Sequence, residues 1–193
     1  MTRAIISLNS GSSSIKFGLY TLGPDGPRHV AGGKLEGIGT SPRILIRSDE
    51  GEVLLEKQWM DGAGLTHEPL LDELYDWAAT HLNRHEVVAV GHRVVHGGSR
   101  FSDPVVITDE VRAAVDDLVP LAPLHNPASL LGIDAAIAAF PDVPQVAVFD
   151  TAFHQSIPAP AHTYAVPAQW REEFRVRRYG FHGTSIRYVT GRS

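Results

Sequence analysis

A Gly- and Ser-rich segment near the N-terminus, NSGSSSIK at residues 9–16, has the composition of a phosphate-binding turn. Gly11 and the serines around it present backbone N–H groups and hydroxyls without bulky side chains, and Lys16 adds a positive charge beside them. The carbonyl of Asn9 is an oxygen ligand of the kind that a hydrated Mg²⁺ ion takes. The segment lacks the G-x-x-x-x-G-K-[ST] pattern of a P-loop and runs into a predicted strand rather than a helix. Alone, it also fits a serine-rich hairpin turn with an exposed lysine.

A second candidate is the segment GHRVVHGG at residues 91–98, which continues an apolar run expected to be a strand. Ligands bind at the carboxyl ends of strands in open α/β sheets, and an arginine there can hold a carboxylate or phosphate through two parallel hydrogen bonds. Arg93 is therefore a candidate for ligand binding, with a structural ion pair as the equal alternative. His92 and His96 are spaced like metal ligands, but no third ligand is evident, and structural roles are favoured.

Three further segments hold candidate residues. His125, in LAPLHNP, precedes a predicted helix whose N-terminal dipole favours an anion, although a histidine that only shapes the turn is the commoner case. Asp150 ends a second apolar strand, where it can orient Mg²⁺, act as a base or simply close a turn. His182 lies in YGFHGTS, ahead of another predicted helix, and could donate to a transferring phosphoryl group.

The spacing of apolar residues predicts the strands and helices that must position these side chains. Strands are expected at 3–9, 15–20, 30–38, 44–47 and 53–59, with a turn at 23–27. Helices are expected around 70–78 after a Thr66 cap, at 108–118, and from an Asn126 N-cap to 140. The apolar runs 87–90 and 146–149 predict strands covered on both faces. Strands first, then alternating helix and strand, indicate an α/β domain with an antiparallel edge of hairpins and a parallel centre.

Composition and charge narrow the function class and the compartment. The formal charge of −5 argues against a nucleic-acid partner, and no stretch approaches the ~20 apolar residues of a membrane span. We expect no signal peptide before the first strand, and the lack of cysteine fits the cytoplasm.

A change in composition after Asp150 predicts a domain boundary there. Residues 1–150 are expected to form an N-terminal domain and residues 151–193 the beginning of a second one. Thr184 or Ser185 would cap a last helix with few residues left to complete it, and we interpret this ending as a truncation.

Five motifs taken together resemble one family closely. NSGSSSIKF, GHRVVHGG, LAPLHNP, FDTAFH and RRYGFHGTS occur in the same order as in the acetate kinases, which share a superfamily with sugar kinases, heat-shock chaperones and actin. The resemblance covers the whole chain, but the family is about twice as long, so these residues correspond to its first half. It implies an actin-like ATPase (ribonuclease H-like) fold with a mixed sheet and the start of a second, similar domain. It also implies a homodimer with its active site in a cleft between the two domains.

The resemblance assigns a role to each candidate residue. Asn9 would bind Mg²⁺, Arg93 would hold the acceptor carboxylate, Asp150 would be the catalytic acidic residue, and His182 would stabilise the transition state. The remaining assignments fall into two groups, ATP phosphate contacts and a small apolar pocket for the substrate methyl group: Ser10, Gly11, Ser12, Ser14, Lys16 and His125 for the former, and Val95, Leu124 and Phe181 for the latter.

The implied reaction is the reversible transfer of the ATP γ-phosphoryl group to acetate, giving acetyl phosphate and ADP. Acetate is already ionised at neutral pH, so we expect Asp150 to position groups rather than remove a proton. Alternatives are a propionate or butyrate kinase, and a non-catalytic truncated fragment that binds phosphate. Ile186 stands where the family usually has a second histidine. Because the family's adenosine-binding segments lie in its second half, we expect the isolated 193-residue chain to be inactive.

Overall fold

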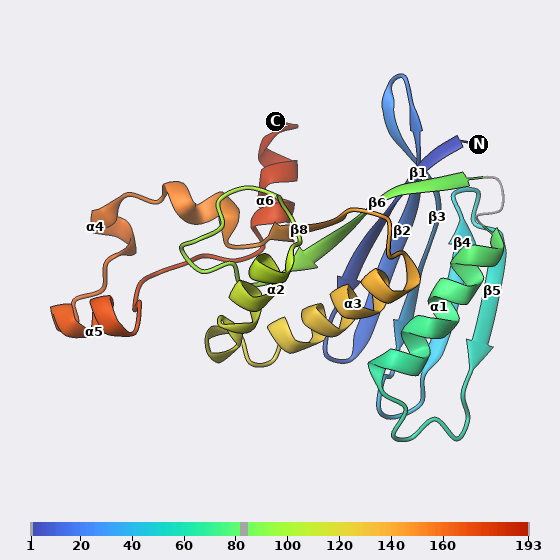
Figure 1. Cartoon of the computed structure of the whole chain (residues 1–193), viewed down its shortest axis with the longest axis horizontal. Coiled ribbons are helices and arrows are strands. Elements are labelled where there is room, and N and C mark those ends of the chain that lie inside the picture. The colour runs from blue at the N-terminus through green and yellow to red at the C-terminus, as the bar shows by residue number, and fades with distance from the viewer. Residues whose placement is uncertain (1, 82–84, 193) are drawn as a thin grey trace.

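The computed structural model describes residues 2–81 and 85–192, and its centre is a mixed sheet of strands in the order β5-β4-β3-β2-β1-β6-β8-β7 (Figure 1). The first five strands pair antiparallel with their neighbours along the chain. They are β1 (Thr2–Ser10), β2 (Ser14–Gly23), β3 (Gly26–Glu36), β4 (Arg43–Ser48) and β5 (Val53–Gln58). This run is the predicted edge of hairpins, and each of the five strands was expected from its apolar spacing.

Two parallel strands complete the centre of the sheet. β6 (His85–Val94) pairs parallel with β1, and β8 (Gln145–Phe149) pairs parallel with β6. The predicted parallel centre is therefore confirmed. A short edge strand, β7 (Val105–Val106), pairs antiparallel with β8 and was not predicted, because two residues carry no readable alternation.

Helices cover one face of the sheet. α1 (His67–His81) and α3 (Asn126–Ala139) lie across that face, and α2 (Asp109–Asp116) packs beside α3 (Figure 1). Alternate residues of β1, Ala4, Ile6 and Leu8, point into the core that these helices close. Thr108 caps α2 by accepting a hydrogen bond from the N–H of Val111 at 3.3 Å, and it lies at the predicted start of that helix.

The expectation that the two central strands are covered on both faces is wrong. Val90 and Val94 of β6 are fully buried, but Val87, Val88 and Ala89 are only partly so, and β8 alternates between buried and half-buried residues. α1 and α3 pack on the face that carries the even-numbered residues of β1. The opposite face carries Asn9, Lys16 and Arg93 and borders an open hollow of about 390 Å³, so the half-covered strands are the ones that display polar groups.

Two predicted helix caps are also wrong. His125, not Asn126, occupies the N-cap of α3 and makes no side-chain cap bond. The Asn126 side chain is instead buried, where it accepts from the N–H of His96 at 3.2 Å and donates to the carbonyl of His96 at 3.1 Å. α6 (Gly183–Thr190) begins after His182, so neither Thr184 nor Ser185 caps it.

The segment after Asp150 is built of short helices. They are η2 (Ala152–Ser156), α4 (Ala159–His162), α5 (Ala168–Glu173) and α6, and a single 3₁₀ turn, η1 (Val119–Leu121), precedes α3. α4 and α5 lie apart from the sheet, on the side of β8, while α6 contacts β8 (Figure 1). The domain boundary near Asp150 stays a prediction. No described helix combines the length and the apolar character that crossing a membrane requires.

Candidate active site

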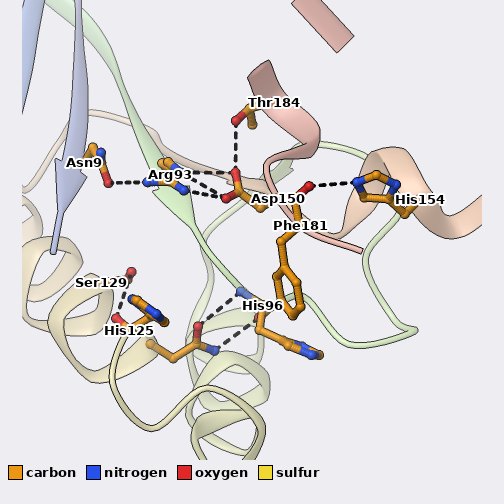
Figure 2. A network of polar contacts seen from close by, with 10 residues as sticks. Asn9, Arg93, His96, His125, Ser129, Asp150, His154, Phe181 and Thr184 are labelled. Carbon is orange, nitrogen blue, oxygen red and sulfur yellow. Dashed lines mark hydrogen bonds and ion pairs between the residues drawn. The ribbon is translucent and has the colours of Figure 1, made fainter. Parts of the chain in front are cut away.

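The centre of the candidate site is an ion pair between two of the predicted residues, Arg93 and Asp150 (Figure 2). The Arg93 Nη2 donates to Asp150 Oδ2 at 2.6 Å, and Nε donates to Oδ1 at 3.1 Å, so the pair is bidentate. Asp150 is fully buried, and about a third of the Arg93 side chain remains exposed. The structural ion pair that the sequence left open for Arg93 is therefore present, and it leaves part of the guanidinium facing solvent.

Asn9 is the third member of this cluster. Its Oδ1 accepts a hydrogen bond from Arg93 Nη1 at 3.2 Å (Figure 2). The three residues come from the carboxyl ends of β1, β6 and β8, which are adjacent parallel strands, and ligands bind at such edges in α/β sheets. An arginine has five N–H donors, of which three serve these partners, so two remain for an incoming carboxylate or phosphate.

The carboxylate and amide oxygens of this cluster all accept hydrogen bonds. Oδ1 of Asp150 accepts from Arg93 and from the hydroxyl of Thr184 at 2.9 Å, while Oδ2 and the Asn9 Oδ1 also accept from Arg93. Among the residues that the structure describes, no group of three or more His, Cys, Asp or Glu side chains is placed to hold a metal. The Asn9 Oδ1 uses one lone pair for Arg93 and keeps a second, so the assignment of Asn9 to Mg²⁺ stays a prediction.

The first turn of α6 is fastened to Asp150. The N–H of Gly183 donates to the backbone carbonyl of Asp150 at 3.0 Å, and Thr184 holds its carboxylate. A Cβ at position 183 would lie 2.2 Å from that carbonyl oxygen, so only glycine fits. His182, immediately before it, has a left-handed backbone with φ of 57°, which turns the chain sharply into the helix. The result brings His182 next to Asp150.

A second histidine is hydrogen-bonded to this loop. His154 Nε2 lies 2.9 Å from the carbonyl oxygen of Phe181, and because a carbonyl only accepts, the ring nitrogen is the donor (Figure 2). Gly180 passes so close that a Cβ there would lie 2.4 Å from the His154 ring. His154 therefore fixes the peptide that precedes His182.

The predicted substrate residues line one pocket of about 550 Å³. Arg93 and Asp150 supply its charged lining, and Val95, Leu124 and Phe181 supply apolar lining. Two further predicted residues, His125 and His182, line the same pocket. Its other lining residues, which were not predicted, are Leu121, Ala122 and Pro123. The pocket therefore combines a guanidinium with an apolar surface, which is the combination that a short-chain carboxylate requires.

The Gly- and Ser-rich turn lies outside this pocket. Asn9 and Lys16, opposite each other in the β1–β2 register, line the neighbouring hollow of about 390 Å³ together with Arg93. Ser12 lines a separate hollow of about 620 Å³ beside the start of α1, and Ser14 begins β2. Ser10 is buried, and its hydroxyl has no hydrogen-bond partner among the described residues, since it faces Gly132 of α3. Its side chain therefore shapes the turn from inside, whereas Gly11, Ser12 and Lys16 are accessible.

His96 has a structural place behind the pocket. Its Nδ1 accepts from the N–H of Gly98 at 3.0 Å, and its ring packs edge-on against Tyr179 at 4.5 Å between centroids. Burial lowers the pKa of His96 below its ordinary value, so the ring is neutral near pH 7. His92 donates from Nε2 to Oε1 of Gln145 at 2.8 Å, and burial likewise lowers its pKa. Both histidines have the structural role that the sequence favoured over metal binding.

Sequence reasoning did not single out Thr184 or His154 as site residues. Thr184 lies in the motif FHGTS and His154 in the motif FDTAFH. A polar side chain within a motif was the only sequence feature that could have indicated a site role for them. Thr151 was also missed, and its hydroxyl accepts from the N–H of Gly97 at 2.9 Å, joining the two motifs.

The order of these motifs and the geometry that they build can be compared with known proteins. The profile of the acetokinase family matches residues 4–193. The chain belongs to the acetokinase family. The acetate kinase of Deinococcus radiodurans is 50% identical over 186 residues, which are 96% of this chain and 45% of that protein. The acetate kinase of Thermotoga maritima is 45% identical over 193 residues, 98% of this chain and 47% of that protein.

Solved structures give the same result at the level of the fold. A propionate kinase from Francisella tularensis matches with a TM-score of 0.86 at 37% identity, covering 98% of this chain and 48% of that one. The acetate kinase of Porphyromonas gingivalis matches with a TM-score of 0.82 at 40% identity, with the same coverage. The predicted actin-like α/β fold is thereby confirmed. The chain spans about half the length of the curated relatives it matches.

Proposed function

We propose that this chain provides the acceptor side of an acetate kinase, which transfers the γ-phosphoryl group of ATP to acetate. The observation that carries the proposal is Arg93, which is held by Asp150 and Asn9, keeps N–H donors available and lines a pocket with apolar walls. A guanidinium held in this way can bind a carboxylate with defined direction. Family membership supports the same reaction class.

At the acceptor end, acetate would accept hydrogen bonds from the remaining N–H groups of Arg93 while its methyl group contacts Val95, Leu124 and Phe181. Acetate has a pKa near that of Asp and Glu, about 4, so no base is needed to generate the nucleophile. Asp150 is not built as a base, because both of its oxygens already accept hydrogen bonds. We assign it the role of fixing the angle and position of the Arg93 guanidinium.

At the donor end, the accessible part of the Gly- and Ser-rich turn, Gly11, Ser12 and Ser14 with Lys16, would contact the ATP phosphates. His182, beside Asp150, would donate to the transferring phosphoryl group, and His125 lies on the same pocket wall. Phosphoryl transfer depends on positioning and on neutralising charge, which these donors supply. We propose a direct in-line transfer, which inverts a chiral γ-phosphate; retention of configuration would contradict it. Asn9, whose Oδ1 keeps one free lone pair, would hold Mg²⁺ beside the phosphates, and the ion would lower the charge of ATP there.

The substrate can be tested with an acyl-hydroxamate assay on the purified native product that contains these residues, using acetate, propionate and butyrate. We expect the highest kcat/KM with acetate, and loss of Arg93 should raise the KM for the carboxylate at least about tenfold. Activity that is unchanged in Arg93→Ala would remove the basis of the proposal.

Propionate is the second candidate, because the propionate kinase of Francisella tularensis is among the close structural matches. One methylene changes the binding free energy by only about 1–3 kcal/mol in an apolar pocket, so we expect both substrates to react, with different values of kcat/KM. A kcat/KM for propionate above that for acetate would reassign the substrate.

The activity of the isolated 193 residues is a separate question. We expect this polypeptide alone to form no acetyl phosphate, since it spans about half the length of its relatives. An intact mass of 21.0 kDa for the native product, with no hydroxamate formed, would favour the alternative of a non-catalytic phosphate-binding fragment. A larger, active product would favour the kinase. A homodimer in the cytoplasm is proposed on family grounds, and light scattering and cell fractionation test it.

A further inference from the structure

The turn between β1 and β2 is held to the rest of the protein by few hydrogen bonds. The N–H of Gly11 donates to the carbonyl of Ser14 at 2.8 Å, and the N–H of Ile38 donates to the carbonyl of Ser13 at 3.3 Å. Across the described part of the chain, no acceptor is found for the N–H of Ser12 or Ser13, and both residues are exposed. These two amides are therefore available to a ligand, provided that something sets their direction.

One side chain reaches this turn from a distant part of the sequence. His67, the first residue of α1, lies 56 positions away, and its Nε2 is 2.7 Å from the carbonyl oxygen of Gly11. Because the carbonyl only accepts, Nε2 carries the proton. The ring borders the hollow of about 620 Å³ beside Ser12, so tight packing does not explain its position, and the hydrogen bond does.

The geometry of a peptide bond carries this contact through to the amide of Ser12. The peptide between Gly11 and Ser12 is trans and planar, so its C=O and N–H point in opposite directions. Fixing the Gly11 carbonyl towards α1 therefore aims the Ser12 N–H away from α1. Glycine on one side of this peptide leaves its plane free to rotate if the carbonyl is released.

We propose that His67 is a positioning residue that holds the Gly11–Ser12 peptide so that the Ser12 amide binds a phosphate of the nucleotide. This proposal deepens the proposed function and rests on it, because it takes a nucleotide polyphosphate as the ligand of the turn. A histidine that only anchored the start of α1 would affect stability without changing the direction of the amide.

Two substitutions in the native product distinguish positioning of the Ser12 amide from anchoring of α1. His67→Leu keeps bulk but has no donor, and His67→Gln keeps an N–H close to the position of Nε2. His162→Leu, at a histidine of α4 that lines none of the hollows described above, serves as the matched control. Inorganic tripolyphosphate is the first probe, followed through the amide signals of Gly11 and Ser12 in ¹H–¹⁵N spectra, and equilibrium unfolding is measured on the same samples.

We expect His67→Leu to shift the Ser12 amide signal and to weaken tripolyphosphate binding about tenfold, the loss of one good hydrogen bond. His67→Gln should restore the amide signal and the affinity for tripolyphosphate, and His162→Leu should change neither. In the kinase assay, the KM for ATP should rise about tenfold in His67→Leu while the KM for the carboxylate stays within twofold.

The proposal is overturned if His67→Leu leaves the Ser12 amide signal and the affinity for tripolyphosphate unchanged. It is also overturned if His67→Gln and His67→Leu weaken tripolyphosphate binding equally, or if the wild-type turn binds no tripolyphosphate. Failure of the proposed function has a different signature. A wild-type protein that binds tripolyphosphate at Ser12 in a His67-dependent manner, yet transfers no phosphoryl group to any carboxylate, would retain the positioning role and lose the assigned reaction.

Discussion

The two partners of the central ion pair differ in burial, and this difference predicts unequal mutational effects. The Asp150 side chain is 1% exposed and that of Arg93 is 32% exposed. Arg93→Ala leaves a buried carboxylate without its counter-charge, which we expect to cost about 3–5 kcal/mol of unfolding free energy. Asp150→Ala should cost less, because water can reach the released guanidinium. Both variants should lose activity if the acceptor role of Arg93 is right.

Urea unfolding of the two variants tests this ranking. Arg112→Ala is the control, since its pair with Asp134 at 2.6 Å is about 40% exposed on both sides and should contribute only about 0–1 kcal/mol. Equal losses in Arg93→Ala and Asp150→Ala would show that burial of the carboxylate does not dominate the energetics of the pair.

His92 predicts how stability changes with pH. Burial lowers its pKa in the folded protein, whereas the unfolded chain has the ordinary value of about 6.5. Between the lowered value and 6.5, the unfolded state binds more protons, so the unfolding free energy falls as the pH falls through this range. The slope contributed by one such histidine is at most about 1.4 kcal/mol per pH unit.

The measurement is the unfolding free energy of wild type and His92→Gln at pH 7.5, 6.5 and 5.5. Glutamine can still donate to Gln145 but does not titrate, so the decline on acidification should be shallower in the variant. It should not vanish, because burial lowers the pKa of His96 as well. Identical slopes in the two proteins would contradict the assignment to His92.

Single residues could be nominated from the sequence, but their partners could not. Arg93 stood between two interpretations because its partners lie 57 and 84 positions away, and no local pattern encodes such contacts. His67 and His154 were missed for the same reason: each acts on a carbonyl 56 or 27 residues distant. Motif residues with an intrinsic chemistry were nominated, whereas residues that act only through backbone groups were not.

At the scale of elements, periodicity predicted the longer strands and helices and where they lie, but not β7 or the short helices η2, α4 and α5. The alternation in β1 and the helical spacing in α1 both follow from burial on one face, so apolar spacing alone located them. The predictions of which strand faces are covered and of which residues cap the helices α3 and α6 were wrong, because both depend on which neighbour packs against an element. The buried Asn126, taken for an N-cap, serves the backbone of His96 instead.

Packing of α3 on β1 depends on the absence of a side chain at Gly132. A Cβ there would lie 2.7 Å from the Cβ of Ser10. We expect Gly132→Ala to destabilise the protein by about 1–3 kcal/mol, since the helix must move away from the sheet. Thermal and urea unfolding measure the change.

A double-mutant cycle with Ser10→Gly gives the control for this contact. Removing the Ser10 side chain makes room for the new methyl group, so the double variant should lose less than the sum of the two single losses. Strict additivity would mean that the strain of Gly132→Ala arises elsewhere in α3.

At the scale of the whole molecule, the segment after Asp150 exposes large apolar side chains. Trp170 of α5 is 51% exposed and Phe174 beyond it is 61% exposed. Exposed apolar patches favour association. We expect the isolated 193-residue chain to associate with rising concentration, and Trp170→Ser with Phe174→Ser to weaken this in sedimentation experiments. Met60→Ser, at an 81% exposed residue after β5, should have no effect. Equal behaviour of both variants would contradict the assignment of the patch.

The parallel pairing of β1 with β6 has a consequence for the time at which the site appears during folding. β1 to β5 join through short turns, and contacts between near neighbours along the chain form first because little loop entropy is lost. The register of Thr2 with His85 requires closing a loop that contains all of these hairpins. Asn9, Arg93 and Asp150 meet only after that closure, so the Gly- and Ser-rich turn can form before the pocket around Arg93 does.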